Sequence, residues 1–330
     1  MQLTNGRHGV RNAAVIIGIC TSFALTACSS AQPDTEPSAA ASATPSAENS
    51  AENIVNTWVG PATDITKIPM GDGKSSTSKA AKGKIFVCQA GQPNAPGAFK
   101  DGPWINGSTW DLSKKIAVNG AKTWPSANFT VSSSGDTRTI KTNGLPVDTV
   151  TGVFPISSSS EAYEYDRNPN KIAKNAATVK VPTSPSPAKS VNCVPNGPVG
   201  VLLNGVFLFN GVDAGGKDAV AHEVQDSCDG HPQQGNTYHY HNITTCIQQS
   251  APGVSTLVGW AGDGYPIVLE RDASGAMPTN ADLDKCHGRT SPILINGDVV
   301  NTYHYSATIE YPYTIGCFRA ANKIDSTTGQ

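Results

Sequence analysis

Two stretches of this chain, NTYHYHN at Asn236–Asn242 and NTYHYSA at Asn301–Ala307, share five consecutive residues. In an extended strand, successive side chains point to opposite faces. Tyr238 and Tyr240 would then face one side, where they pack in a core, while His239 and His241 face the other side. The shared stretch predicts two related strands, and the first copy presents two imidazoles on one face.

The repeat extends beyond these five residues. GVLLNGVFLFNG at 200–211 and LVGWAGDGYPIVLE at 257–270 are both apolar stretches interrupted by Asn-Gly or Asp-Gly, a strong hairpin signal. Each is followed by Cys-x-Gly, a polar loop, NTYHY and a closing cysteine. We therefore predict two related β modules, 199–246 and 257–317, that pack about a pseudo-twofold axis.

Composition favours a mainly β fold with little helix. The chain contains 32 Gly and 23 Pro, and its apolar stretches are short, with turn signals between them. We expect a disulfide-stapled β sandwich or barrel-like domain. The net charge is −2, and no dense run of Lys or Arg is present, which argues against a nucleic-acid partner.

The N-terminus predicts export and a lipid anchor. Arg7 and Arg11 precede an apolar run at 13–25, and LTAC follows, which is typical of a signal cleaved before a lipidated cysteine. We predict a signal peptide at 1–27 and a lipid on Cys28 that anchors the protein to the cell membrane, facing outside the cytoplasm. The alternative is an ordinary secretory signal with an incidental cysteine.

The rest of the chain divides by composition. Residues 28–53 contain mainly Ser, Ala, Pro, Thr, Glu and Asn and predict a disordered tether. We expect an N-terminal β region at 54–130, the main domain with both modules at 131–320, and a C-terminal tail at 321–330.

Six cysteines remain beyond Cys28, and an even number outside the cytoplasm predicts three disulfides. Each NTYHY copy is bracketed by two cysteines, which favours Cys228–Cys246 and Cys286–Cys317. Cys88–Cys193 follows by elimination, although six cysteines permit fifteen pairings. No CxxC spacing favours metal ligation by these thiols.

The histidines beyond the signal all lie between positions 222 and 304. His239 and His241 would lie roughly 7 Å apart on one strand face, a spacing that suits one metal ion with a further ligand. The candidates for completing the site are His222, Glu223, His231 and His304. Imidazoles with a carboxylate favour zinc over copper(II). The alternatives are buried, hydrogen-bonded structural histidines and acid–base catalysis without metal.

Two acids are candidate catalytic residues. Asp263 in GDGYPI could support a metal ligand or act as a general base, and Glu223 in HEVQD could act as a base or lie on a helix surface. HEVQD fails as a HExxH motif because Asp226 replaces the second histidine. Three protein ligands would leave one position for a water that attacks an ester, peptide or phosphate.

These motifs resemble those of the YHYH-domain proteins. The matching stretches are TNGLPVDTVTGVFP, LLNGVFLFN, DAVAHEVQDSCDGHPQQGNTYHYH, GDGYPI, CHGR and TYHYSATIEYPYTIGCF, between about Thr130 and Arg319. The resemblance implies no settled activity. Relatives commonly end the second motif in His, whereas Ser306 stands here, which puts the function of the second motif in doubt.

A non-catalytic function is the alternative, in which a surface glycan- or peptide-binding module, or a structural protein, carries no reaction. Flat aromatic platforms for such a ligand could come from the five tryptophans, Trp58, Trp104, Trp110, Trp124 and Trp260. Burial in a small core is the other expectation for Trp104 and Trp110. GxSxG, P-loop and dinucleotide-binding motifs are missing from the sequence.

Overall fold

The computed structural model describes residues 64–92, 95, 97–244, 246–247, 253–320 and 325–328. These residues belong to one compact unit. The predicted signal, Cys28, the tether and Trp58 lie outside them. The fold is mainly β, as predicted, with one short α-helix, α2 (Ala219–His222), in the described part of the chain.

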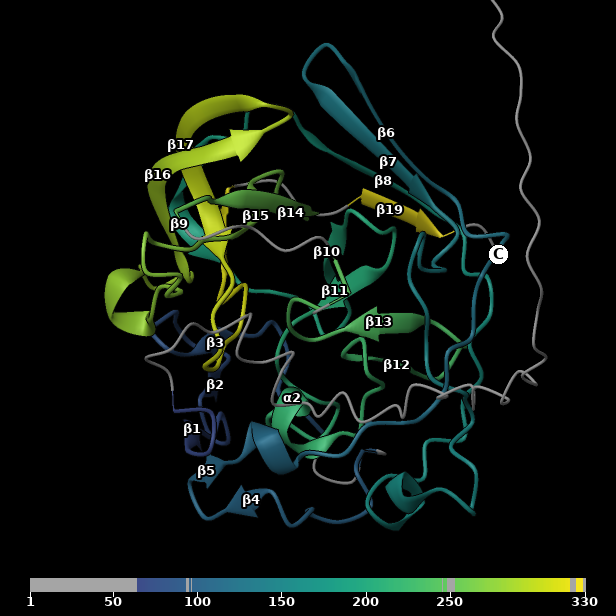
Figure 1. The fold of residues 1–330 in the computed structure, drawn as a ribbon. Coiled ribbons are helices and arrows are strands. Elements are labelled where there is room, and N and C mark those ends of the chain that lie inside the picture. The colour runs from purple at the N-terminus through teal and green to yellow at the C-terminus, as the bar shows by residue number, and fades with distance from the viewer. Residues whose placement is uncertain are drawn as a thin grey trace, which may run out of the picture. The chain divides into compact units, whose positions relative to one another are not determined.

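The largest sheet has eight strands in the order β12-β13-β11-β10-β14-β15-β17-β16 (Figure 1). Their bounds are β12 Gly230–Pro232, β13 Tyr238–Tyr240, β11 Phe207–Phe209, β10 Pro198–Leu202, β14 Thr256–Ala261, β15 Pro266–Leu269, β17 Asp298–Ser306 and β16 Gly288–Ile295.

The eight-stranded sheet is symmetric about its middle, apart from an additional parallel pairing of β14 with β16. β10 and β14 pair antiparallel at the centre, and each also pairs antiparallel with the next strand of its own module, β11 or β15. β13 then runs parallel to β11, and β17 runs parallel to β15. The outer strands β12 and β16 pair antiparallel with β13 and β17. The predicted duplication is therefore present in strand order, direction and register.

A four-stranded sheet packs on one face of this large sheet. It contains β19 (Asp325–Thr328), β8 (Ala177–Pro182), β7 (Thr137–Thr142) and β6 (Phe129–Ser134) in that order. Ile140 and Val179 from this sheet share one buried cluster with Val201, Phe207 and Trp260 from the large sheet. Apolar side chains of two sheets thus interdigitate, as in a sandwich.

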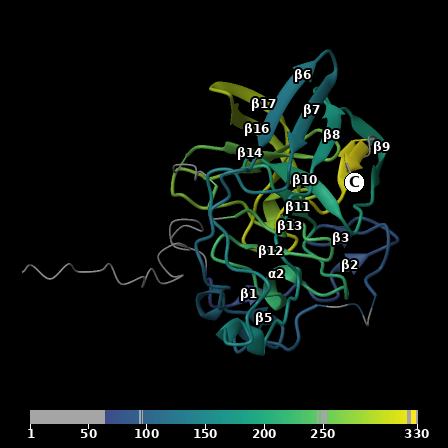
Figure 2. The same ribbon diagram turned by 90° about the vertical axis from the view of Figure 1, so that its right-hand side faces the viewer.

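Smaller elements complete the described residues. Three short strands form the order β1-β5-β4 (Ile68–Pro69, Thr109–Trp110, Ile105–Asn106), β2 (Ser75–Ser76) pairs with β3 (Ile85–Phe86), and β18 (Phe318–Ala320) pairs with β9 (Pro187–Asn192). Three 3-10 turns lie at Leu112–Lys114, Glu161–Glu164 and Asn280–Asp282. α2 lies beside β12 and β13 in both views (Figure 1, Figure 2).

Three disulfides staple the fold in the pairing that the bracketing cysteines favour: Cys88–Cys193, Cys228–Cys246 and Cys286–Cys317. Because thiols stay reduced in the cytoplasm of most cells, these bonds indicate an extracytoplasmic location. Among the described residues, none of the helices has the length and apolar character needed to cross a bilayer.

Candidate metal centre

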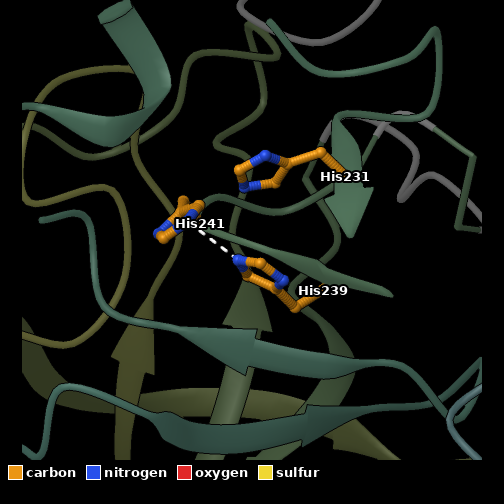
Figure 3. A group of neighbouring side chains, drawn as sticks. All are labelled: His231, His239 and His241. Atoms are coloured by element: carbon orange, nitrogen blue, oxygen red, sulfur yellow. Dashed lines mark hydrogen bonds between the residues drawn. The ribbon is translucent and has the colours of Figure 1, made fainter. Parts of the chain in front are cut away.

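Three histidines meet where β12 and β13 pair. His231 on β12 lies directly opposite His239 on β13. His241 is the first residue after β13. One ring nitrogen from each can be chosen so that all three lie within 4.8 Å of one another. Figure 3 shows the three rings converging on one point. This cluster, hereafter the histidine cluster, could hold a metal ion.

Backbone carbonyls fix two of the rings. His239 Nδ1 lies 3.2 Å from the carbonyl oxygen of Thr237, and His241 Nδ1 lies 2.5 Å from that of Asn210. A carbonyl can only accept a hydrogen bond, so each Nδ1 carries the proton. A neutral imidazole then presents an unprotonated Nε2, and a bond from Nδ1–H to a carbonyl is the usual support of a metal-binding histidine.

The two unprotonated nitrogens face each other. His239 Nε2 lies 3.1 Å from His241 Nε2. If both rings are neutral, two lone pairs oppose each other at this distance. Either a shared proton or a metal cation must therefore lie in this position.

Burial opposes the shared proton. His231, His239 and His241 are all buried, with at most 4% of their surfaces exposed. Burial lowers the pKa of all three rings, which for His241 falls to about 4, and lowers those of His231 and His239 well below their ordinary value. At neutral pH the cluster is therefore uncharged, the form that binds metal.

Glu223 completes the surroundings of the histidine cluster. It is the first residue after α2, whose N-cap Asp218 accepts a hydrogen bond from the amide of Ala221. Glu223 Oε2 lies 3.4 Å from the Nε2 atoms of both His231 and His241. Burial, followed by Asp213 and Asp166, raises the pKa of its carboxyl well above the ordinary value. The helix-surface interpretation of Glu223 is therefore wrong.

Several buried polar atoms here lack a hydrogen bond. Within the described residues, both ring nitrogens of His231 and the Oε2 of Glu223 have no hydrogen-bond partner. Buried polar groups are normally paired, and leaving one unpaired costs ~1–3 kcal/mol. One cation bound between them would take one ring nitrogen of His231 and the Oε2 of Glu223.

Two other candidate ligands lie elsewhere. The ring nitrogens of His222 bond instead to Asp101 Oδ1, at 2.9 Å, and Asp72 Oδ2, at 3.0 Å. His304 Nε2 lies 2.8 Å from Glu270 Oε1 in the second module. Neither is part of the histidine cluster.

Asp263 lies in the turn between β14 and β15 and has a full set of partners. It accepts hydrogen bonds from the hydroxyl of Tyr305 at 2.7 Å and from the backbone amides of Arg319 and Ala320, both at 3.0 Å. Asn204 occupies the same turn position in the first module and donates to the hydroxyl of Tyr240 at 3.0 Å. These contacts give Asp263 a structural task in the second module.

The tryptophans do not form an exposed row in the described residues. Trp104 and Trp110 are almost fully buried, at 0% and 1% exposure, and Trp260 is 7% exposed. Trp124 is half-buried. The prediction that Trp104 and Trp110 form a platform for a ligand is therefore wrong.

Comparison with known proteins places the histidine cluster inside a family domain. Residues 178–277 match the family model described as YHYH protein. The match includes the histidine cluster, Glu223 and Asp263 but ends before the second NTYHY copy. No curated protein and no solved structure matches the chain.

Proposed function

We propose that this chain, which carries a YHYH domain, is a lipid-anchored extracytoplasmic protein that binds one divalent metal ion. The ligands are His231, His239 and His241. The observation that carries the proposal is the pair of opposed Nε2 atoms of His239 and His241, 3.1 Å apart in a buried site.

Zinc suits these ligands best. Two imidazole nitrogens bound at ~2.0–2.1 Å to one tetrahedral zinc lie roughly 3.3 Å apart. The separations of 3.1 Å between His239 and His241, and of 3.4 Å from Glu223 Oε2 to two of the rings, are close to this edge length. Neutral imidazoles and a carboxylate are also ligands that zinc prefers, and copper(II) ranks second.

Glu223 lies at the edge of the site, beside two of the three ligands. Its Oε2 is buried without a hydrogen bond and lies equally far from His231 and His241. Movement of this carboxylate onto the metal would add a fourth protein ligand and close the site, which is the arrangement of structural zinc centres. Binding of the metal would then stabilise the fold, because the ligands come together only in the folded chain.

Hydrolysis is the second candidate activity. It requires one open position on the metal for water and a path for a substrate. The buried state of all three imidazoles and of Glu223 Oε2 favours the closed site instead. A folded, metal-loaded chain that cleaves model ester, peptide or phosphate substrates, and loses this activity in Glu223→Gln, would favour hydrolysis.

The anchor rests on the sequence. Cys28 follows Leu25-Thr26-Ala27 after an apolar run, so its sulfur would carry the lipid that inserts into the membrane. Metabolic labelling with a clickable palmitate analogue should mark the wild-type protein and leave Cys28→Ser unmarked. Equal labelling of both would refute the anchor.

The metal is tested on purified protein. The chain is exported into an oxidising compartment, purified without chelator, and its metal content is measured by mass spectrometry. We expect about one zinc per wild-type chain and none in a His239→Ala, His241→Ala double variant. His304→Ala is the matched control, because it removes the same residue from the second NTYHY copy, and it should keep its zinc. Equal, near-zero metal in wild type and double variant would refute the proposal.

A further inference from the structure

The two modules correspond residue by residue around the NTYHY strands. Tyr238 donates its hydroxyl hydrogen to Asp226, with oxygen distances of 2.8 and 3.0 Å, and Tyr303 donates to Asp284 at 3.1 and 3.2 Å. Each of these aspartates also accepts from the amide of the cysteine two residues later. The second module therefore contains a position equivalent to each residue of the histidine cluster.

Strand register identifies those positions. His231 pairs with His239 across β12 and β13, and Arg289 pairs with His304 across β16 and β17. Arg289 thus stands where His231 stands in the first module. His304 corresponds to His239, and its Nδ1 likewise lies 3.0 Å from the carbonyl two residues earlier.

The position of the third ligand holds a much smaller side chain in the second module than in the first. Ser306 occupies the place of His241. Its hydroxyl donates to Glu270 Oε1, which also lies 2.8 Å from His304 Nε2. A carboxylate oxygen therefore lies between the two positions whose nitrogens face each other in the first module.

Glu270 takes this place because of its position on the chain. It follows β15 directly, and the hairpin alignment matches it with Gly211, which follows β11 in the first module. Gly211 has no side chain that could enter the histidine cluster. Glu270 is 3% exposed, and its Oε2 accepts from Arg289 Nε at 2.9 Å and Nη2 at 2.5 Å.

The Glu270 carboxylate is surrounded by hydrogen-bond donors and a positive charge. Both ring nitrogens of His304 face acceptors, the carbonyl of Thr302 and the carboxylate of Glu270. Arg289 places a positive charge next to Glu270. The carboxylate is therefore fully paired without a metal ion.

We propose that the second module contains a latent site for a divalent cation, in which the Glu270 carboxylate, paired with Arg289 and His304, occupies the place of the ion. The chain accordingly binds one ion rather than two. Replacing Glu270, Arg289 and Ser306 by the residues of the first module opens a second site. This inference rests on the proposed metal binding by the first module.

The test uses the full exported chain and a Glu270→Gly, Arg289→His, Ser306→His triple variant. Bound zinc is counted by mass spectrometry, and cobalt(II) titration is followed by its visible absorption. We expect the triple variant to bind one equivalent more than the wild type. In the triple variant, additional His239→Ala and His241→Ala substitutions should leave one equivalent, held by the second module.

A triple variant with three intact disulfides and native circular dichroism that binds no more metal than the wild type would overturn the inference. A wild type that binds no metal would instead refute the proposed function. If the triple variant fails to fold, ¹⁵N NMR of the wild type decides. His304 Nε2 should carry a hydrogen that is bonded to the Glu270 carboxylate and protected from solvent exchange, and an Nε2 without this hydrogen bond would overturn the inference.

Discussion

The buried ion pair around Glu270 gives the sharpest stability prediction. Burial alone would raise the pKa of Glu270, but hydrogen bonds from His304 and Arg289, with a further one from Ser306, outweigh it and lower the pKa to about 2 from an ordinary value of 4.5. A shift of this size corresponds to roughly 3 kcal/mol in favour of the folded chain at neutral pH. The side chain of Arg289 is 39% exposed, so solvent screens its charge and the expected contribution to the free energy of unfolding is lower than this figure.

The perturbation is Glu270→Gln, which keeps the size of the side chain and removes its charge. We expect the free energy of unfolding to fall by about 2–3 kcal/mol at pH 7. The pKa is lowered in the folded chain, so the stabilisation is fully present above about pH 4.5 and is lost as the pH falls toward 2. The difference between wild type and variant should therefore shrink between pH 4.5 and pH 3.

The assay is urea unfolding with the disulfides intact, at pH 7 and at pH 3. Glu164→Gln is the matched control, because Glu164 pairs with Lys100 at 2.6 Å while both side chains are about half exposed. An exposed pair of this kind contributes less than about 1 kcal/mol. The reasoning fails if both variants lose the same stability at pH 7, or if the loss in Glu270→Gln is unchanged at pH 3.

Three further predictions concern single residues, each measured by urea unfolding. Tyr305→Phe removes a hydroxyl that donates to buried Asp263 at 2.7 Å, so it should cost about 1–3 kcal/mol; no loss would contradict the contact. Burial lowers the pKa of His287 to about 3, so wild-type stability should fall as the pH drops from 6.5 toward 3. Asn tolerates the backbone φ of 68° at this position, so His287→Asn should lose less stability than the wild type between pH 6.5 and 4.5. Equal losses of stability in the two proteins would contradict the prediction. Gly230→Ala should cost at least ~2 kcal/mol, because its Cβ would lie 2.2 Å from the ring of Tyr238, and a neutral result would contradict the packing.

Sequence reasoning predicted the scaffold because its signals are local. The repeated NTYHY, the Asn-Gly and Asp-Gly turns and the bracketing cysteines each lie within one module, and they sufficed for the duplicated strands and the disulfide pairs. The joint placement of His239 and His241 followed from strand alternation alone. The structure places both in the histidine cluster.

The third ligand could not be chosen from the sequence. His222, Glu223, His231 and His304 were all candidates there, and the pairing register between β12 and β13 decides for His231. This register depends on how the two strands pair across the connection at 233–237. No local sequence pattern near His222 or His304 reveals the carboxylates that form hydrogen bonds with their ring nitrogens.

The roles of Glu223 and Glu270 depend on the burial of their carboxyl groups, which the sequence does not specify. The position of Glu223 directly after a four-residue helix places its carboxyl against the histidine cluster, although most glutamates are exposed. Glu270 was missed as a partner of His304. Aligning the two hairpins would have shown an acid in place of Gly211, directly after an apolar strand.

The central claim is that a cation lies between His231, His239 and His241. Anomalous diffraction from crystals of the exported chain, recorded on both sides of the zinc absorption edge, tests it most directly. We predict one strong peak about 2.0–2.1 Å from the Nε2 atoms of His239 and His241 and from one ring nitrogen of His231. A map without a peak there would contradict the claim.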